Sequence, residues 1–135
     1  MNSPKYLGHK PIISVNDYDK IDAQYKNNID VKALSIGTAP YDFDEISLKV
    51  WRHTSTKWSR QSEEIALHRS IDLNILLVAS FLKDITSDYP NSNLREEVDD
   101  LSKVNLIKDY YNDDESFLRP RLEELHGKLK EFLKK

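Results

Sequence analysis

Residues 45–53 read Glu-Ile-Ser-Leu-Lys-Val-Trp-Arg-His, and this alternating stretch decides the fold class. Branched apolar side chains occupy every second position and would share one face of an extended chain. That apolar set is Ile46, Leu48 and Val50, and the opposite set is Ser47, Lys49 and Trp51. A period of two residues predicts a β-strand with two chemically different faces.

Further strands are expected on both sides of this one. Residues 11–15 and 31–36 are short apolar runs, and Gly37 is expected to end the second. Residues 56–60 follow a short polar turn and are expected to form a last strand. The N-terminal half is therefore predicted to form a small antiparallel sheet of three to four strands.

Helical spacing is found between these strands and throughout the C-terminal half. Residues 17–26 carry apolar side chains at helical intervals and acids in the first turns, so they predict a helix. A second helix is expected to start near Ser62 or at Ser70 and to be buried on most sides. Its apolar stripe is Ile71, Ile75, Val78, Leu82 and Ile85.

The last third of the chain predicts more helix. Residues 94–111 are expected to form one interrupted helix or two short ones, and a final helix is expected to begin near Asp114 or Pro120. The stripe expected to be buried in that final helix is Leu122, Leu125, Leu129, Phe132 and Leu133. The predicted class is α+β, with the N-terminal antiparallel sheet packed against the C-terminal helices.

Length and composition limit the kinds of protein this chain can be. At 135 residues, the sequence predicts a single domain spanning residues 1–135, with residues 1–10 as a flexible arm. The formal net charge of −3 gives no overall field for duplex nucleic acid or an acidic membrane surface, so neither is an expected partner. The absence of cysteine, of a signal-like start and of a long apolar run predicts a cytoplasmic protein.

Residues 51–69, here called the basic segment, carry a positive local charge, although the net charge of the whole chain is negative. They hold both tryptophans, together with fixed cations and two histidines. Arginine offers paired donors that match phosphate, and an indole offers a face on which a base can stack. The predicted ligand-binding residues are Arg52, His53, Lys57, Trp58, Arg60, His68 and Arg69.

The same residues also admit a purely structural interpretation. Charges on a hairpin protect an edge strand from aggregation, and Trp51 would serve equally well as a core residue. Glu63 and Glu64 would then pair with Arg60 and Lys57. Both interpretations remain open on the sequence alone.

Catalytic, metal and cofactor motifs are not found in the sequence. His53 and His68 are the candidates for acid–base chemistry, but no nucleophile-elbow or paired His-x-Thr pattern accompanies them, so no catalytic residue is assigned. The histidines lack metal-ligand spacing, so no metal site is expected. The three glycines are too scattered for a phosphate-cradling loop, and no cofactor is predicted.

One part of the chain resembles a known group of proteins. The run Lys-Val-Trp-Arg-His-Thr at residues 49–54, with Lys-Trp-Ser-Arg-Gln-Ser-Glu-Glu at residues 57–64 and the pair His68-Arg69, is similar to a family of small bacterial proteins of unknown function. This resemblance implies no reaction, ligand or catalytic residue.

Three functions follow from these observations as hypotheses. The leading one is a non-enzymatic binding protein for a small anion, such as a nucleotide or cyclic nucleotide, held by the basic segment. The second is an enzyme that acts on a phosphorylated or nucleotide substrate through His53 or His68. The third is a protein–protein interaction module, such as an inhibitor, antitoxin or adaptor. The wide apolar helix faces also predict a homodimer or a higher homo-oligomer.

Overall fold

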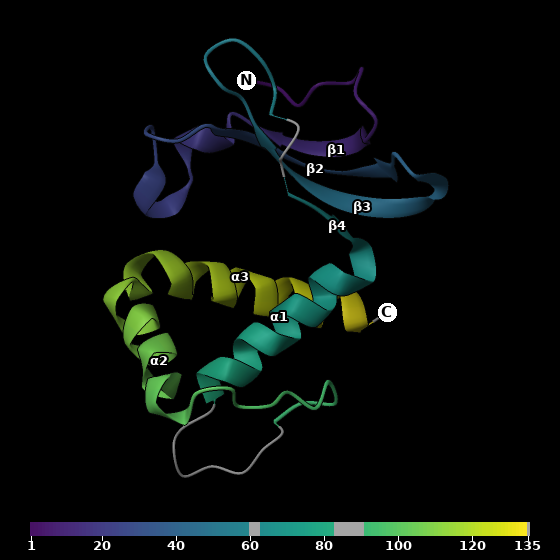
Figure 1. The fold of residues 1–135 in the computed structure, drawn as a ribbon. Coiled ribbons are helices and arrows are strands. Elements are labelled where there is room, and N and C mark those ends of the chain that lie inside the picture. The colour runs from purple at the N-terminus through teal and green to yellow at the C-terminus, as the bar shows by residue number, and fades with distance from the viewer. Residues whose placement is uncertain (60–62, 83–90, 135) are drawn as a thin grey trace. The chain divides into compact units, whose positions relative to one another are not determined.

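The computed structural model describes residues 1–59, 63–82 and 91–134, and for residues 42–45 it describes the backbone only. The chain divides into two compact units, Met1–Leu73 and Asn74–Lys135, which we call the sheet unit and the helical unit. Strands come first along the chain and helices follow (Figure 1), which confirms the α+β class. The number of domains stays a prediction.

The sheet is a four-stranded antiparallel meander. Its strands are β1 (Lys10–Asn16), β2 (Val31–Ala39), β3 (Asp42–Arg52) and β4 (Glu64–Ala66), and they lie side by side in chain order. The three strands predicted around residues 11–15, 31–36 and 45–53 are confirmed.

Strand β2 does not end at Gly37, contrary to the prediction. Gly37 pairs with Pro11 of β1 and with Ser47 of β3, so the strand continues through it. A side-chain Cβ at this position would lie 2.0 Å from the carbonyl oxygen of Lys10. Glycine is required here because the backbone of β1 approaches it closely, not because the strand turns.

The fourth strand is formed by Glu64–Ala66, and the described part of the strand predicted at residues 56–60, which is residues 56–59, is not a strand. There, a single bridge joins His53 to Trp58 across a short turn. The helix predicted to start near residue 62 begins only at Leu67, because Glu64 lies in the sheet opposite Lys49. A tertiary contact has overridden the helix propensity of glutamate.

The helix predicted over residues 17–26 is also wrong. Two short 3₁₀ helices, Tyr18–Lys20 and Ala23–Tyr25, replace it. Asp17, Ala23 and Asn27 all have positive φ angles of 50–67°. Left-handed residues cannot continue a right-handed helix, so the chain turns repeatedly at these points.

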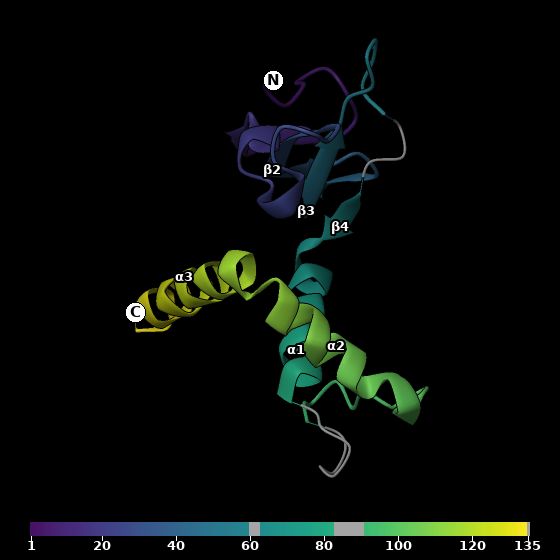
Figure 2. The same ribbon diagram turned by 90° about the vertical axis from the view of Figure 1, so that its left-hand side faces the viewer.

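The α-helices in the described residues are α1 (Leu67–Leu82), α2 (Val104–Asp113) and α3 (Glu115–Leu133), with a 3₁₀ turn at Leu101–Lys103 before α2. The start of α3 directly after Asp114 was predicted. The helix α3 leaves the end of α2 at an open angle (Figures 1 and 2). The three helices therefore form no closely packed bundle.

Helix α1 is not the buried helix that its composition predicts. Ile71 is 54% exposed and Ile75 is 41% exposed, whereas Ala79 is the one buried residue of α1. Ile85, the last member of its predicted stripe, lies outside the described residues. The stripe of α3 is exposed in the same way, so two helices whose apolar faces were expected in a core present them largely to solvent.

Candidate functional site

The two tryptophans of the basic segment serve mainly to build the sheet unit. Trp51 of β3 is fully buried, and its ring contacts Trp58 edge-on at 5.8 Å between centroids. The ring of Trp58 contacts His53 in turn, at 4.9 Å. Because Trp51 is sealed in the core, no ligand can stack on it; Trp58 is half-buried.

Arg52 is already neutralised by the protein. Its guanidinium donates to Asp30 at 2.7 Å and to Glu63 at 3.0 Å. The hydrogen bonds to Glu63 and then to Asp30 raise the pKa of Arg52 above its ordinary value. A phosphate would have to displace these two carboxylates, so Arg52 is a weaker anion ligand than its sequence suggested. The predicted pairing of Glu63 with Arg60 stays a prediction, because Arg60 lies outside the described residues.

The other predicted ligand residues are dispersed. Lys57 lies exposed at the tip of the turn between His53 and Trp58, whereas His68 and Arg69 are exposed in the first turn of α1. Arg60 lies outside the described residues. These residues are close in sequence. In the described part of the chain, however, no contact joins Lys57 to His68 or Arg69.

His53 lines a polar hollow of about 610 Å³ in the sheet unit. Lys32 lies in the same wall, where its ammonium group donates to the carbonyl oxygen of Ile29 at 3.0 Å and pairs with Asp19 at 3.4 Å. The remaining lining residues are Met1, Asn28, Ile29, Asp30, Thr54 and Ser55. The ammonium group of Lys32 and the carboxylate of Asp30 thus line one hollow with opposite charges.

A buried chain of hydrogen bonds that the sequence did not predict includes Trp51 and Glu64 of the basic segment. His9 is 1% exposed, and its ring nitrogens lie 2.8 Å from the hydroxyl of Ser47 and 2.9 Å from the hydroxyl of Ser35. Ser47 donates to Glu64 at 2.8 Å, and the indole N–H of Trp51 donates to Ser35 at 2.8 Å. We call these five residues the hydrogen-bond chain.

The directions of these bonds follow from the donors available. Ser47 gives its one proton to Glu64, so it must accept from Nδ1 of His9. Ser35 accepts from Trp51 and is left to donate to Nε2 of the same ring. Every donor then has an acceptor, and the chain ends at a carboxylate that also receives the ammonium group of Lys49 at 3.3 Å.

The hydrogen-bond chain contains a serine, a histidine and an acid, but it is structural. Burial lowers the pKa of His9 from 6.5, with Glu64 acting in the opposite direction and Lys49 lowering it further. The imidazole is therefore held neutral, as its two bonds require. Ser47 is 0% exposed, so no substrate can reach its hydroxyl. The sequence carries no local signal for this arrangement, because Ser35 and Ser47 lie on different strands and His9 is far from both along the chain.

The N-terminal residues are anchored by two separate sets of hydrogen bonds. Besides His9, the buried Ser3 bonds the hydroxyl of Ser14 at 2.6 Å, and its backbone N–H donates to Asn16. These contacts fix two points in the predicted arm. Its flexibility stays a prediction.

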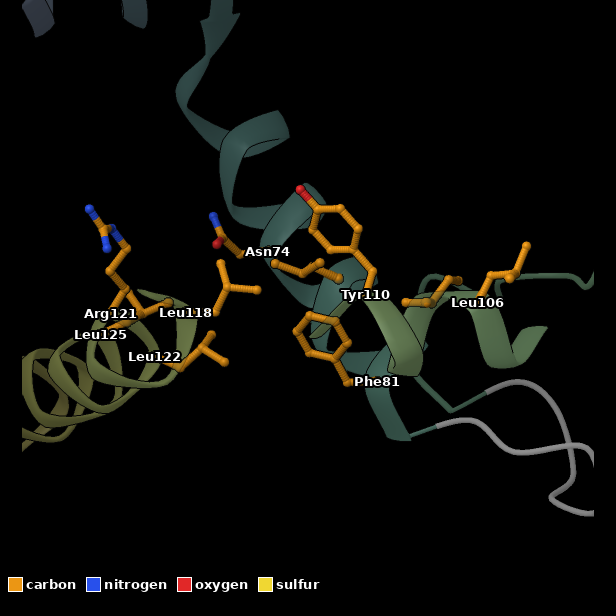
Figure 3. Close-up of a pocket in the computed structure, with 10 residues that line it drawn as sticks. Asn74, Phe81, Leu106, Tyr110, Leu118, Arg121, Leu122 and Leu125 are labelled. Atoms are coloured by element: carbon orange, nitrogen blue, oxygen red, sulfur yellow. The ribbon is translucent and has the colours of Figure 1, made fainter. Parts of the chain in front are cut away.

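The helical unit contains a pocket of a different kind. It has a volume of about 570 Å³ and lies where the second half of α1, α2 and α3 meet. Its walls are mostly aliphatic and aromatic, and the polar ends of Asn74, Tyr110 and Arg121 gather along one edge (Figure 3). The apolar lining residues are Leu77, Phe81, Leu106, Ile107, Leu118, Leu122 and Leu125. We call it the helical pocket.

Leu122 and Leu125 were predicted to belong to a buried stripe, so the pocket that they line was not expected from the sequence. Phe81 is held in place by the ring of Tyr111, 5.1 Å away. The pocket thus has apolar walls, but no side chain of the described residues fills the space between them. Binding clefts for apolar ligands usually have this composition.

Residues 1–101 match the model of a family of unknown function, DUF6530. The chain belongs to this family. No curated protein and no solved structure matches the chain significantly. The resemblance to proteins of unknown function, seen first in the basic segment, is thus confirmed at the level of the family.

The DUF6530 match includes the sheet unit and α1 and ends at Leu101. It therefore includes the hydrogen-bond chain and the α1 wall of the helical pocket. The α2 and α3 walls lie beyond it.

Neither a metal-binding cluster nor a membrane-spanning helix is found in the described residues of this DUF6530 member. In residues 1–59, 63–82 and 91–134, no group of three or more acidic or histidine side chains is arranged to hold a metal ion. In those same ranges, no helix has the length and apolarity required for a transmembrane span.

Proposed function

We propose that this protein is a non-enzymatic interaction module that binds an apolar helix of another protein in the helical pocket. The observation that carries the proposal is the pocket itself, an apolar cleft walled by three helices with polar groups confined to one edge. A groove between helices is a common docking site for a partner helix.

The shape of the apolar surface favours an elongated ligand. The stripe of α3 continues past the pocket from Leu125 to Leu129, which is 49% exposed. A small molecule would fill the pocket and leave this extension uncovered. A helix, with apolar residues every three or four positions, would contact both.

The histidines give little support to an enzyme. His53 packs against Trp58, His68 is exposed on α1, and His9 is sealed inside the sheet unit. A general base needs a partner that orients it and access to substrate, and each of these three meets at most one of those needs.

The proposal is tested with a labelled peptide of about three heptads that carries leucine at the core positions and glutamine elsewhere on its surface. We expect fluorescence anisotropy to detect its binding to the full chain. Leu122→Asp should abolish binding by placing a charge in the pocket wall, whereas Leu94→Asp, at an exposed leucine outside it, should not. Equal binding by both variants would contradict the proposal.

Small-anion binding is a second candidate, and the hollow beside His53 favours it. Lys32, His53 and the side chains of Asn28, Thr54 and Ser55 provide donors around a space large enough for a nucleotide. The nearby carboxylate of Asp30 is occupied by Arg52, which reduces its repulsion toward an anion.

Isothermal titration with a panel of mononucleotides and cyclic nucleotides tests this second candidate. Binding should weaken in Lys32→Ala and remain in Lys57→Ala, since Lys57 lies at the exposed turn and not among the lining residues of the hollow. The absence of heat with every nucleotide, for a chain shown to be folded, would refute it.

A further inference from the structure

The apolar stripe of α3 has the spacing of a coiled-coil seam. Successive members are separated by four, three, four and three residues, which is the alternation of core positions in a heptad. The members are Leu118, Leu122, Leu125, Leu129 and Phe132, and we call them the α3 seam. Its first three residues line the helical pocket. The pocket and the seam are therefore parts of one surface.

The positions that flank this seam are all basic or histidine. In a heptad these flanks face the partner helix and choose it by charge. Arg119 and His126 lie on one flank, and Arg121 and Lys128 lie on the other. No carboxylate occupies a flank position between residues 118 and 132, although the chain as a whole carries a net charge of −3.

The acids of α3 lie beside these cations on the same helix. Arg119 bonds Glu123 at 2.8 Å and approaches Glu115 at 3.7 Å, and Lys128 bonds Glu131 at 3.2 Å. These pairs are exposed, and exposed pairs along a helix contribute little to stability. The cations can therefore share their charge with carboxylates of a partner at small cost.

The other walls of the pocket do not cancel this pattern. The polar residue contributed by α1 is the uncharged Asn74, and α2 contributes Leu106, Ile107 and Tyr110. Arg121 is the one charged residue among the described residues that line the pocket, and its guanidinium donates to the carbonyl oxygen of Phe117. The charge contributed by the described pocket lining is therefore positive.

We infer that the partner helix is acidic along its flanks: an amphipathic helix with apolar core positions and glutamate or aspartate beside them. This inference rests on the proposed function and adds the chemistry of the partner. A second copy of α3 fits poorly, because pairing two identical seams brings the basic and histidine flank positions of one copy against those of the other.

Three peptides with one leucine core and different flanks test the inference. The flanks carry glutamate, glutamine or lysine, and affinity for the full chain is measured by anisotropy at low and high salt. We expect the glutamate peptide to bind about tenfold or more tighter than the glutamine peptide, and the lysine peptide to bind weakest. The advantage of glutamate should shrink as salt rises, because these charges are exposed.

A matched pair of charge reversals locates the effect on the chain. Arg121→Glu with Lys128→Glu should exchange the preference, so that the lysine peptide binds tighter than the glutamate peptide. Lys130→Glu with Lys134→Glu makes the same change in net charge on the same helix but away from the seam flanks, and it should keep the preference for glutamate. Circular dichroism checks that both double variants keep the helix content of the natural chain.

The outcomes separate the two proposals. Equal binding of the glutamate and glutamine peptides would overturn the acidic partner while leaving helix docking in place. No binding by any peptide would overturn both. A stable homodimer in native mass spectrometry that is dissociated by Leu125→Asp, with no peptide bound, would assign the seam to self-association and would also overturn the acidic partner.

Discussion

The sheet unit and the helical unit use their side chains in opposite ways. The sheet unit buries a tryptophan, a histidine and two serines in one hydrogen-bonded interior. In the described residues of the helical unit, Ala79 and Val104 are the buried ones, and rows of leucine face outward. The apolar side chains that stabilise most helical units are here on the surface.

This difference assigns the two units different roles. A polar interior in which each donor has an acceptor specifies one structure, and its disruption is costly. An apolar surface is costly to leave in water and gains free energy when a partner covers it. On the proposed function, the sheet unit is the scaffold of this chain and the helical unit carries the surface on which a partner docks.

The largest expected effect is that of Trp51→Ala. Removing a fully buried indole leaves a cavity and takes away the N–H that donates to Ser35, so the free energy of unfolding of the sheet unit should fall by about 3–5 kcal/mol. Both tryptophans lie in the sheet unit, so the fluorescence of the remaining Trp58 reports its denaturant unfolding, and far-UV circular dichroism reports the helices.

Leu125→Ala is the matched change in the helical unit. Leu125 is 39% exposed, and its truncation should alter stability by less than about 0.5 kcal/mol. A loss comparable to that of Trp51→Ala would break the comparison, because it would mean that this leucine belongs to a core.

The next effect is that of Gly37→Ala. The new Cβ would lie 2.0 Å from the carbonyl oxygen of Lys10, and this is a contact with backbone that cannot rotate away. We expect a loss of about 1–3 kcal/mol in the free energy of unfolding, the usual cost of overpacking. Chemical denaturation followed by tryptophan fluorescence measures it, and an unchanged midpoint would show that β1 can move away from β2.

A third effect concerns pH and again is confined to the sheet unit. The pKa of His9 is lowered in the fold, so the unfolded chain binds the proton more readily. Stability from this residue is complete above the unfolded pKa of 6.5 and is lost as the pH falls from there toward the folded pKa. Glu64 and Lys49 face the ring and favour opposite protonation states.

The measurement is the free energy of unfolding against pH, for the natural chain and for His9→Gln. The natural chain should lose stability between about pH 7 and the folded pKa, and the variant should show a shallower slope over the same interval. The slope is the informative quantity, because the substitution also changes the absolute stability. Parallel slopes would mean that His9 does not carry the effect.

The fold was largely predictable where the signal is local. The alternation of residues 45–53 predicted β3 and the side of the strand on which Trp51 lies, and the turn after His53 was also expected. Strand β4 was missed because glutamates at its start favour a helix, and the contacts that hold Glu64 in the sheet, such as those with Ser47 and Lys49, come from a distant part of the sequence.

The candidate sites were less predictable for the same physical reason. His9 is a single histidine far along the chain from Ser35 and Ser47, so no spacing reveals the hydrogen-bond chain. The basic segment drew attention by composition, yet composition does not say that Asp30, outside the segment, bonds Arg52. The α3 seam, in contrast, is readable from sequence as alternating steps of four and three.

The smallest expected effect, Gly127→Ala, tests the exposed character of the helical unit. A Cβ at Gly127 of α3 would meet nothing within 4 Å, in contrast to Gly37. Alanine restricts the unfolded chain and favours helix, so stability should rise by about 0.5–1 kcal/mol. Thermal unfolding followed by circular dichroism measures this gain.

The same glycine also bears on where a partner docks. Gly127 lies on the face of α3 opposite the seam, so the substitution should leave the affinity for the glutamate-flanked peptide unchanged. Opposite signs for Gly37→Ala and Gly127→Ala would establish that one unit is closely packed and the other is open at this face. A loss of stability or of peptide affinity in Gly127→Ala would show instead that this face of α3 is covered, and the division of roles between the two units would fail there.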